Sequence, residues 1–348
     1  MCKSICVDLC SSVVPFSLFC TTGILLGHRM LDYYRLSHFG DSHMKTITAI
    51  ILLGLIVAAP SFVQSKALPD GQEAKRPAML VSTVWLQDHL HDPGMIIFHV
   101  AGNRREYKEG HIPGARFLWT QALAYSDPDL TLELPSIAQA DSVLKKLGVT
   151  EGVRIVLYFD NGNVSPATRV FYTFDYLGLG DHVCLLDGGM DAWKAEGRPL
   201  SSEIPEVAPG GSSPHLNREI VASCDWVRDN LKNREVTIVD ARAPQFYEGK
   251  SGGMPRAGHI PGAVNIPFSS LVDSTNKLKD PATLRKIFQQ AGVKPGSRVV
   301  SYCHIGQQAT VVYFVARYLG YDAAVYDGSF EEWSGRKDLP VENPAGTK

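Results

Sequence analysis

The sequence lacks a strong charge imbalance and contains no block of like charges. Its 34 lysine and arginine residues nearly balance 36 aspartate and glutamate residues, which gives a net charge of −2. Nucleic-acid-binding proteins usually carry a basic surface, so this balance argues against nucleic acid as a partner. With 45% hydrophobic and 20% charged residues, the chain is globular in composition, which excludes a collagen-like or wholly disordered protein.

The sequence also lacks the spacings that bind metals. It contains no C-x-x-C pair and no paired histidine and cysteine spacing of the zinc type, so we expect neither a metal nor an organic cofactor. Beyond the first 77 residues the only cysteines are Cys184, Cys224 and Cys303. An odd number leaves at least one thiol outside any intramolecular disulfide. The apolar surroundings of Cys184 and the helical context of Cys224 predict small buried side chains there.

No apolar run near the N-terminus is long enough for a permanent membrane anchor. The run Ile47–Val57 has about half of the ~20 residues that a spanning helix needs. It follows Lys45 and precedes small and polar residues at 58–67, which is typical of a cleaved secretory signal peptide. We therefore expect export, for example to the periplasm, with no stable membrane insertion after processing.

A signal peptide at this place leaves an unexplained stretch before it. Translation from Met44 would make residues 1–43 a misassigned extension. Alternatively, residues 12–26 form a membrane-associated segment of their own. Residues 1–77 are therefore assigned to an N-terminal extension and signal peptide, outside the predicted fold.

The remainder of the chain repeats itself. The string GHIPGA occurs at residues 110–115 and again at 258–263. The stretch that begins Leu186-Asp-Gly-Gly recurs as Tyr326-Asp-Gly-Ser. Order and spacing are kept apart from an insertion within residues 249–257 of the second copy. We conclude that the chain contains two copies of one domain.

The predicted class is α/β, with two domains that each contain a central, mostly parallel sheet covered by helices on both faces. In the second copy, strands at 236–239 and 298–302 are separated by a helical pattern at 281–291. Strands that alternate with helices favour a parallel sheet. The predicted organisation is a first domain, a Ser-, Pro- and Gly-rich linker and a second domain, at residues 78–200, 201–217 and 218–342.

Cys303 occupies the most informative position in the chain. It lies between the strand at 298–302 and a helix predicted from about 310 to 319. Ligands of parallel sheets bind at the carboxyl ends of strands, and helix N-termini stabilise anions. Both effects favour a thiolate, so we expect a pKa below the usual ~8.5. The polar loop that follows predicts no apolar pocket around the thiol.

These features resemble the tandem-domain rhodaneses, a family of sulfurtransferases, and in particular an exported bacterial type. The resemblance covers about residues 79–342. It rests on the Tyr107-x-x-x-His-Ile-Pro-Gly-Ala115 segment, on the stretch Ala323–Trp333, and on Cys303 at the start of the family's catalytic loop. It implies that Cys303 takes the sulfane sulfur of thiosulfate as a persulfide. The implied partners are a small anionic sulfur donor and a thiol or cyanide acceptor, and we expect a monomer.

The resemblance also implies roles for the residues around Cys303. Arg242 would bind the anionic end of the donor, and Asp240 would orient Arg242. The loop would surround the donor with His304, Ile305, Gly306, Gln307, Gln308 and Ala309. The two glutamine side chains can bind an anion by hydrogen bonds. The equivalent loop of the first copy has no cysteine, and Gly102 corresponds to Arg242 at an offset of 140, so the first domain is expected to be inactive.

Aromatic residues of the repeated motifs have predicted structural roles. His111 and His259 are expected to fix the turn of the GHIPGA motif. Trp193 and Trp333 are expected to be core residues.

Three other functions are alternatives to thiosulfate sulfurtransferase activity. A cysteine phosphatase needs an arginine six residues after its nucleophile, and that position is Ala309. A 3-mercaptopyruvate sulfurtransferase is the runner-up, because the loop lacks the two basic residues common in thiosulfate-using relatives. It also lacks the small Gly-Ser-type loop of mercaptopyruvate-using ones. A non-catalytic sulfur carrier or partner-binding module is disfavoured by the presence of Cys303 and Arg242.

Overall fold

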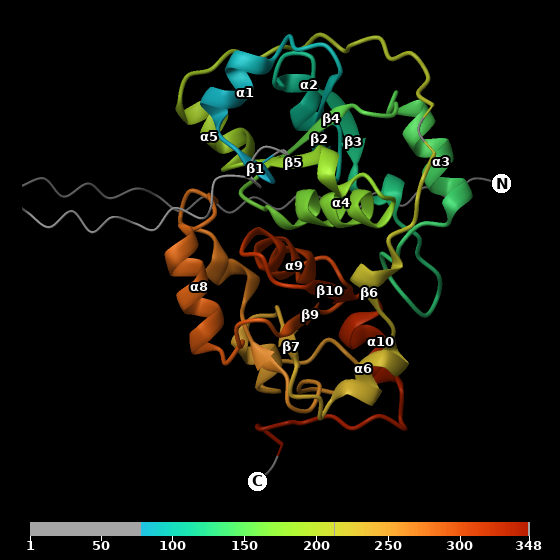
Figure 1. Cartoon of the computed structure of the whole chain (residues 1–348), viewed down its shortest axis with the longest axis vertical. Helices are drawn as coiled ribbons and strands as arrows, with labels where there is room; N and C mark the ends of the chain where they lie inside the picture. Colours follow the sequence, from blue (N-terminus) through green and yellow to red (C-terminus); the bar gives the residue numbers. More distant parts are fainter. Residues whose placement is uncertain (1–77, 212, 347–348) are drawn as a thin grey trace, which may run out of the picture. The chain divides into compact units, whose positions relative to one another are not determined.

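A computed structural model describes residues 78–211 and 213–346 (Figure 1). The predicted signal peptide, the start at Met44 and the segment at 12–26 lie outside these residues. Among the helices of the described part, none is both long and apolar enough to cross a bilayer.

The first domain contains a five-stranded parallel sheet in the order β1-β5-β4-β2-β3. Its strands are β1 Leu80–Val81, β2 Met95–Ala101, β3 Arg116–Trp119, β4 Arg154–Phe159 and β5 Val183–Leu186. Its α-helices are α1 Thr83–His89, α2 Arg105–Glu109, α3 Ile137–Lys146, α4 Ser165–Tyr176 and α5 Gly189–Ala195. Two short 3₁₀ helices complete it, η1 Thr120–Leu123 and η2 Gly180–His182.

The second domain repeats this topology, with a parallel sheet in the order β6-β10-β9-β7-β8. Its strands are β6 Val221–Ala222, β7 Val236–Asp240, β8 Val264–Asn265, β9 Arg298–Tyr302 and β10 Ala323–Tyr326. Its helices are α6 Cys224–Asn230, α7 Pro244–Tyr247, α8 Pro281–Gln290, α9 Ala309–Tyr318 and α10 Ser329–Gly335, with η3 Arg218–Ile220 and η4 Phe268–Leu271. The identical strand orders and the parallel pairing confirm the predicted duplication and fold class.

Side-chain alternation along β9 explains why helices cover both faces of the second sheet. Val299 belongs to the cluster that contains α8 and α9 side chains, whereas Val300 and Tyr302 belong to the cluster with α6 and α10. Successive residues of a strand point to opposite faces, so a strand buried on both sides is apolar along its length. Figure 1 shows the sheet between these two helix pairs.

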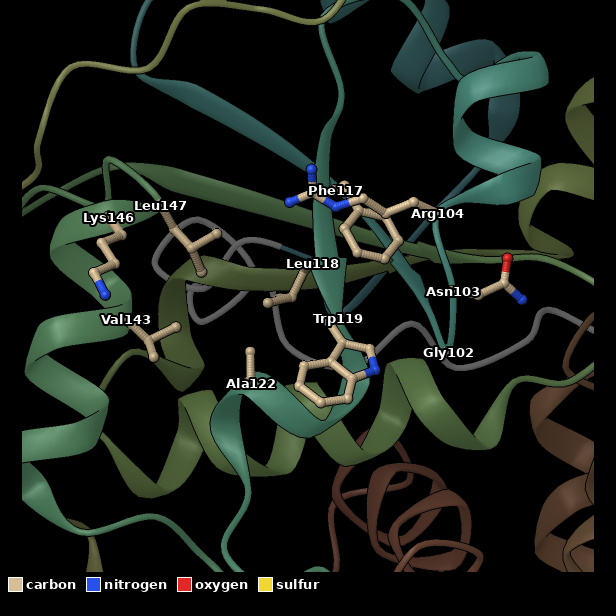
Figure 2. A pocket seen from close by; sticks show the side chains of 10 residues that line it. All are labelled: Gly102, Asn103, Arg104, Phe117, Leu118, Trp119, Ala122, Val143, Lys146 and Leu147. Carbon is tan, nitrogen blue, oxygen red and sulfur yellow. The ribbon is translucent and has the colours of Figure 1, made fainter. Parts of the chain in front are cut away.

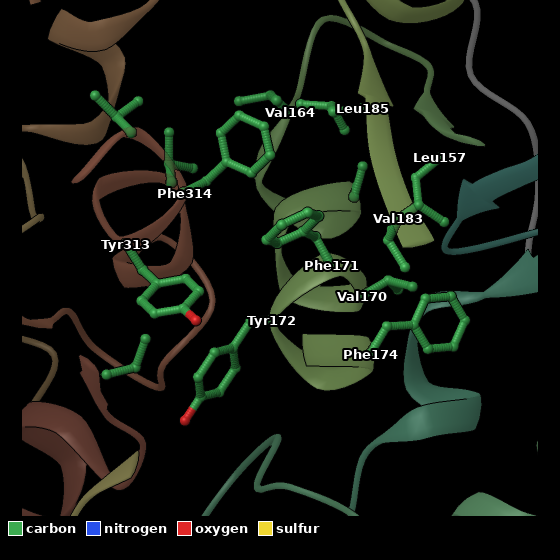
Figure 3. Close-up of a cluster of buried hydrophobic side chains, with 14 of the residues drawn as sticks. Leu157, Val164, Val170, Phe171, Tyr172, Phe174, Val183, Leu185, Tyr313 and Phe314 are labelled. Carbon is green, nitrogen blue, oxygen red and sulfur yellow. The ribbon is translucent and has the colours of Figure 1, made fainter. Parts of the chain in front are cut away.

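The two domains share a hydrophobic core where α4 packs against α9. The rings of Phe171 and Phe314 meet edge to face at 4.8 Å between centroids, and those of Tyr172 and Tyr313 at 5.2 Å (Figure 3). The cluster is continuous through both domains. Because α9 begins at the end of the Cys303 loop, the first domain supports the helix on which that loop depends.

Polar contacts between the domains repeat the internal symmetry. Leu134 N in the first domain donates to Asp327 of the second at 2.8 Å, and Leu278 N donates back to Asp187 at 2.9 Å. The two aspartates occupy the same place in the repeated motif. The Asp-Gly motif that follows β5 and β10 therefore also connects each domain to the other domain.

The segment between the domains runs along the first domain. No helix or strand is present in its described residues, 201–211 and 213–217. Gly210 N donates to Lys145 O at 2.7 Å, and Gly211 N donates to Val149 O at 3.1 Å. The linker is thus held by backbone hydrogen bonds near the end of α3.

The motif residues with predicted structural roles are buried. His111 and His259 each donate from Nδ1 to the carbonyl of the motif tyrosine, at 2.7 Å in both domains. The indoles of Trp193 and Trp333 are fully buried, and each donates its ring N–H to a proline carbonyl at 2.8 Å. The structural roles predicted for these four side chains are confirmed.

Candidate active site

Cys303 lies directly after β9, and α9 begins six residues later at Ala309. The backbone N–H groups of Ile305, Gln308 and Ala309 lie toward the thiol sulfur and favour its anionic form. The Cys303 carbonyl is also held, because it accepts from Phe330 N at 3.0 Å. The loop therefore forms a cradle of fixed N–H dipoles around Sγ, of the kind that stabilises an anion.

The protonation of this thiol differs from the sequence-based expectation. Cys303 is only 1% exposed and belongs to the core shared by both domains. Burial raises its pKa above the ordinary value, and this outweighs the opposing effect of the three N–H groups. The predicted lowering of the pKa and the predicted absence of an apolar pocket are therefore wrong for the resting enzyme. The cradle stabilises the anion once solvent or substrate has reached the site.

The other two thiols in the described part of the chain have no comparable cradle. Burial raises the pKa of Cys184 to about 11 and also raises that of Cys224. The main hydrogen-bonding effects that oppose burial at these thiols come from the side chains of Arg154 and Tyr326. Backbone N–H groups that converge on sulfur thus distinguish Cys303 from the two structural cysteines.

Arg242 forms a buried ion pair with Asp240 beside the loop. Its Nε donates to Oδ1 at 2.9 Å, and Nη2 donates to Oδ2 at 2.6 Å and to Gly258 O at 2.7 Å. The guanidinium lies 4.1 Å from the centroid of the Phe330 ring. Arg242 is 2% exposed, which rules out a surface salt bridge. Within the described residues no hydrogen bond engages Nη1, so this nitrogen is free to bind a donor anion.

His304 and Ile305 add no fixed charge to the site. The His304 ring meets Phe246 edge-on, at 4.6 Å between centroids. Burial lowers the pKa of His304, and the positive charge of Arg242 lowers it further. The imidazole is therefore neutral near pH 7, and its contact with Phe246 gives this side of the loop an aromatic character.

The two glutamines do not both face the thiol. Gln307 Nε2 donates to Ser165 Oγ of the first domain at 3.0 Å. Its role as an anion ligand stays a prediction. The side chain ties the loop to the start of α4. Gln308 Oε1 is buried, and the Gln308 side chain acts on the neighbouring His304 ring, where it opposes the lowering of the His304 pKa. Gln308 acts at the sulfur through its backbone N–H.

A buried ion pair between the domains supports the loop from behind. Arg169 on α4 pairs with Asp327, and both side chains are at most 7% exposed. Gly306 has a φ of +79°, and a Cβ there would lie 2.8–2.9 Å from Asp327 and Arg169 atoms. Only glycine fits this close approach without displacing the pair. Arg169 was not among the predicted site residues, although a charge directly before the apolar run Val170–Phe174 was a visible signal.

Glu133 introduces a pH dependence into this network. Burial and the nearby charge of Asp327 raise its pKa from 4.5 to about 8, with Glu331 and Glu332 adding to the effect and Arg169 opposing it. The folded protein thus holds a proton that the unfolded chain releases above about pH 5. Stability is therefore lost as the pH rises from about 5 to 8.

We expect a Glu133→Gln variant to avoid that loss, because glutamine stays neutral. Between pH 5 and 8 the wild type should lose about 1–3 kcal/mol relative to the variant, a range discounted because the side chain is partly exposed. Urea unfolding at pH 5, 6.5 and 8 measures the difference. The matched control is Glu151→Gln, an exposed glutamate of the same domain. Parallel pH profiles for the wild type and Glu133→Gln would contradict this account.

The equivalent site of the first domain is filled differently. Tyr158 and Tyr302 are equivalent, because the hydroxyl of each accepts a hydrogen bond from an isoleucine N–H of the repeated GHIPGA motif. In the first sheet Tyr158 lies opposite His99, and in the second sheet Tyr302 lies opposite Asp240. The residue that corresponds to Arg242 is therefore Ala101. The match to Gly102 was wrong by one position, because strand register rather than a constant offset defines equivalence.

No nucleophile is present in the first-domain loop. His99 takes the position of Asp240, and its Nε2 lies 2.9 Å from Oδ2 of Asp160, which takes the position of His304. Phe159 stands where the second domain has Cys303. The arrangement can support packing but cannot form a persulfide.

Fold and site together define a class: a two-domain α/β protein in which, among the described residues, Cys303 is the cysteine that lies in a cradle of backbone N–H groups. Both domains match the family described as Rhodanese-like domain, at residues 82–196 and 223–336. The chain belongs to this family of sulfurtransferases and carries its domain in tandem.

Curated relatives match over most of the chain. The sulfur carrier protein TtuD of Thermus thermophilus is 35% identical over 76% of this chain and 96% of its own length. A thiosulfate sulfurtransferase of Azotobacter vinelandii is 33% identical over 76% of this chain and 97% of its own length. The thiosulfate sulfurtransferase of Rattus norvegicus is 31% identical over 74% of this chain and 92% of its own length.

A solved structure supports the fold. The anaerobic ergothioneine biosynthesis enzyme of Chlorobium limicola aligns with a TM-score of 0.69 and 24% sequence identity. The alignment covers 82% of this chain and 74% of that one. At this identity the likeness concerns the arrangement of the two domains.

Proposed function

We propose that the chain is a thiosulfate sulfurtransferase that works through a persulfide on Cys303. The Cys303 thiolate attacks the outer sulfur of thiosulfate and forms a new S–S bond. The original S–S bond breaks, and sulfite leaves with its electron pair. Cyanide or a thiolate then attacks the outer sulfur of the persulfide and regenerates the Cys303 thiolate. Splitting the transfer into two displacements is ordinary covalent catalysis by an activated nucleophile.

The observation that carries this proposal is the convergence of three backbone N–H groups on the Cys303 sulfur. The same groups can stabilise the thiolate, and then the terminal sulfur anion of the persulfide once it occupies the cradle. Such preorganised dipoles are most effective where water is excluded, as it is at this buried residue. Arg242 Nη1 supplies the contact for the departing sulfite.

The rival donor is 3-mercaptopyruvate, which carries one carboxylate. The specific observation in its favour is the ion pair between Arg242, the cation beside the thiol, and Asp240. Because Asp240 neutralises Arg242, the site has little net positive charge, which suits a donor with a single negative charge. Cyanolysis by the purified protein, with each donor in turn, compares the two. We expect kcat/KM to be at least about tenfold higher with thiosulfate, a difference of ~1.4 kcal/mol. A higher value with 3-mercaptopyruvate would replace thiosulfate as the donor, and no turnover with either would favour a sulfur carrier.

The two domains should respond very differently to mutation. Asp160→Asn in the first-domain loop keeps the hydrogen bond to His99 and removes no reacting group. We expect cyanolysis to stay within about twofold of wild type, because most substitutions away from reacting groups cost little. Asn161→Ala is expected to behave in the same way. A loss comparable to that caused by removing the Cys303 thiol would mean that the first loop takes part in the chemistry.

Export through a cleaved signal peptide is also proposed, on the support of the sequence pattern at residues 45–67. Expression of the full chain followed by fractionation and N-terminal sequencing tests it. Mature protein that begins within or just after residues 58–67, found in the exported fraction, is the expected result. An intact N-terminus in the cytosolic fraction would contradict the proposal.

A further inference from the structure

The first domain contains a cavity of about 570 Å³ that is separate from the Cys303 loop. It lies along β3, the edge strand of the first sheet, between the β2–α2 loop and the last turn of α3 (Figure 2). All of its lining residues belong to the first domain, and none belongs to the 303–309 loop. Its volume falls within the ~300–1,000 Å³ typical of sites for small organic ligands.

The walls of this cavity are largely apolar. Phe117, Leu118 and Trp119 come from β3, and Val143 comes from α3. Trp119 is 47% exposed, which is unusual for so large an apolar side chain in this protein. Figure 2 shows the Trp119 indole beside Ala122, and both side chains line the cavity. An exposed aromatic ring at the mouth of a cavity offers a surface on which a flat apolar group can stack.

Two unpaired cations complete the lining. Arg104 contributes from the β2–α2 loop and Lys146 from the end of α3. Neither side chain forms an ion pair or side-chain hydrogen bond within residues 78–211 and 213–346, whereas the adjacent Lys145 pairs with Asp141 at 2.8 Å. No acidic residue lines the cavity. The Arg104 guanidinium is 4.9 Å from the centroid of the Phe117 ring, which holds it at the apolar wall.

We propose that this cavity binds an amphipathic organic anion. The apolar body of the ligand packs against Trp119 and Phe117, and its carboxylate or sulfonate group pairs with Arg104 and Lys146. Charge complementarity favours an anion, because Arg104 and Lys146 are exposed cations at the edge of an apolar surface that no acidic residue lines. The first domain, which lacks a nucleophile, thus carries a ligand site of its own.

A pair of fluorescent probes with the same aromatic body tests the proposal. The first is 1-anilinonaphthalene-8-sulfonate, and the second is N-phenyl-1-naphthylamine, which lacks the sulfonate. We expect saturable binding of the sulfonate at one site, at least about tenfold tighter than binding of the neutral probe. Energy transfer from tryptophan to the bound sulfonate should fall in Trp119→Phe, since Trp119 contacts the probe.

Variants then separate the charged and apolar parts of the site. Arg104→Gln and Lys146→Gln should each weaken sulfonate binding about three- to tenfold and leave binding of the neutral probe unchanged. Lys108→Gln, an exposed lysine of α2 that does not line the cavity, is the matched control and should change neither. Ala122→Phe should fill the cavity and abolish binding of both probes.

Because anilinonaphthalenesulfonate also binds partly unfolded proteins, each variant is checked by near-UV circular dichroism and by cyanolysis. For the three charge variants both readouts should match wild type, since the cavity is separate from the Cys303 loop. For Trp119→Phe and Ala122→Phe, which change the aromatic content, cyanolysis alone should match wild type. This control also keeps the test independent of the proposed donor. Equal affinity for the two probes would overturn the proposal. Unchanged sulfonate binding in Arg104→Gln and Lys146→Gln would do so as well.

Discussion

A Cys303→Ser variant is expected to lose sulfur transfer by at least about 10³-fold in kcat/KM while its fold is retained. Serine occupies nearly the same volume and can sit in the same N–H cradle. Its hydroxyl is a far weaker nucleophile than a thiolate and cannot become a persulfide. Steady-state cyanolysis with thiosulfate measures the loss, and near-UV circular dichroism establishes that the core around residue 303 is intact.

The other two buried thiols provide matched controls. Cys184→Ser and Cys224→Ser change the same atom in equally buried surroundings, at 0% and 5% exposure. Both variants should retain kcat/KM within about twofold, and each should be less stable by the ~1–3 kcal/mol cost of burying a hydroxyl. The assignment of the nucleophile would be wrong if Cys303→Ser kept substantial activity or if either control lost it.

The second large effect is expected at Arg242. If Nη1 binds the sulfonate end of thiosulfate, Arg242→Ala should lower kcat/KM by about 10–150-fold, mainly through KM. This corresponds to the ~1.5–3 kcal/mol of a charge-assisted hydrogen bond. Because alanine also leaves Asp240 buried without its partner, that variant should lose about 3–5 kcal/mol of stability. Arg242→Lys keeps a charge for Asp240 but not the planar donor, so it should fold and recover only part of the activity.

The pH dependence of the Arg242→Ala defect provides an independent readout. The charge of Arg242 helps to hold the pKa of His304 below its ordinary value of 6.5, so the substitution should raise that pKa. His304 then becomes cationic at a higher pH than in wild type and can replace part of the lost charge. The defect in kcat/KM should therefore shrink as the pH falls from 8 to 5, provided that enough Cys303 remains ionised.

Arg228 offers the matched control for this experiment. It is 41% exposed and pairs with Asp225 on the surface of the same domain. Arg228→Ala should leave kcat/KM unchanged and cost at most about 1 kcal/mol of stability. If Arg242→Lys kept wild-type kcat/KM for thiosulfate, the guanidinium would have no role in donor binding.

Much of the fold follows from local patterns. Strand β9 was predicted at residues 298–302, where the structure has it, because an apolar β-branched run ends at the polar loop after Cys303. The helix at 281–291 was predicted from apolar spacing and ends one residue earlier, at Gln290. The duplication is visible because two motifs recur in order, and this alone predicts that both sheets share one strand order.

The contacts made across the domain interface could not be predicted in this way. Arg169 and Asp327 are 158 residues apart, and Gln307 and Ser165 are 142 apart. The spacing of apolar residues within a helix does not indicate which helix of the other domain it will pack against. The pKa of Cys303 was predicted in the wrong direction for the same reason, since the burial that raises it comes from the packing of α4 and α9 around the loop.

Mass spectrometry of the protein after reaction with thiosulfate tests the central claim most directly. The wild type, mixed with thiosulfate and then freed of excess donor, should gain the mass of one sulfur atom. Proteolysis under non-reducing conditions should place that sulfur on the peptide containing Cys303, and cyanide should remove it with release of thiocyanate. An added sulfur on Cys184 or Cys224, or no added mass while cyanolysis proceeds, would contradict a mechanism through the Cys303 persulfide.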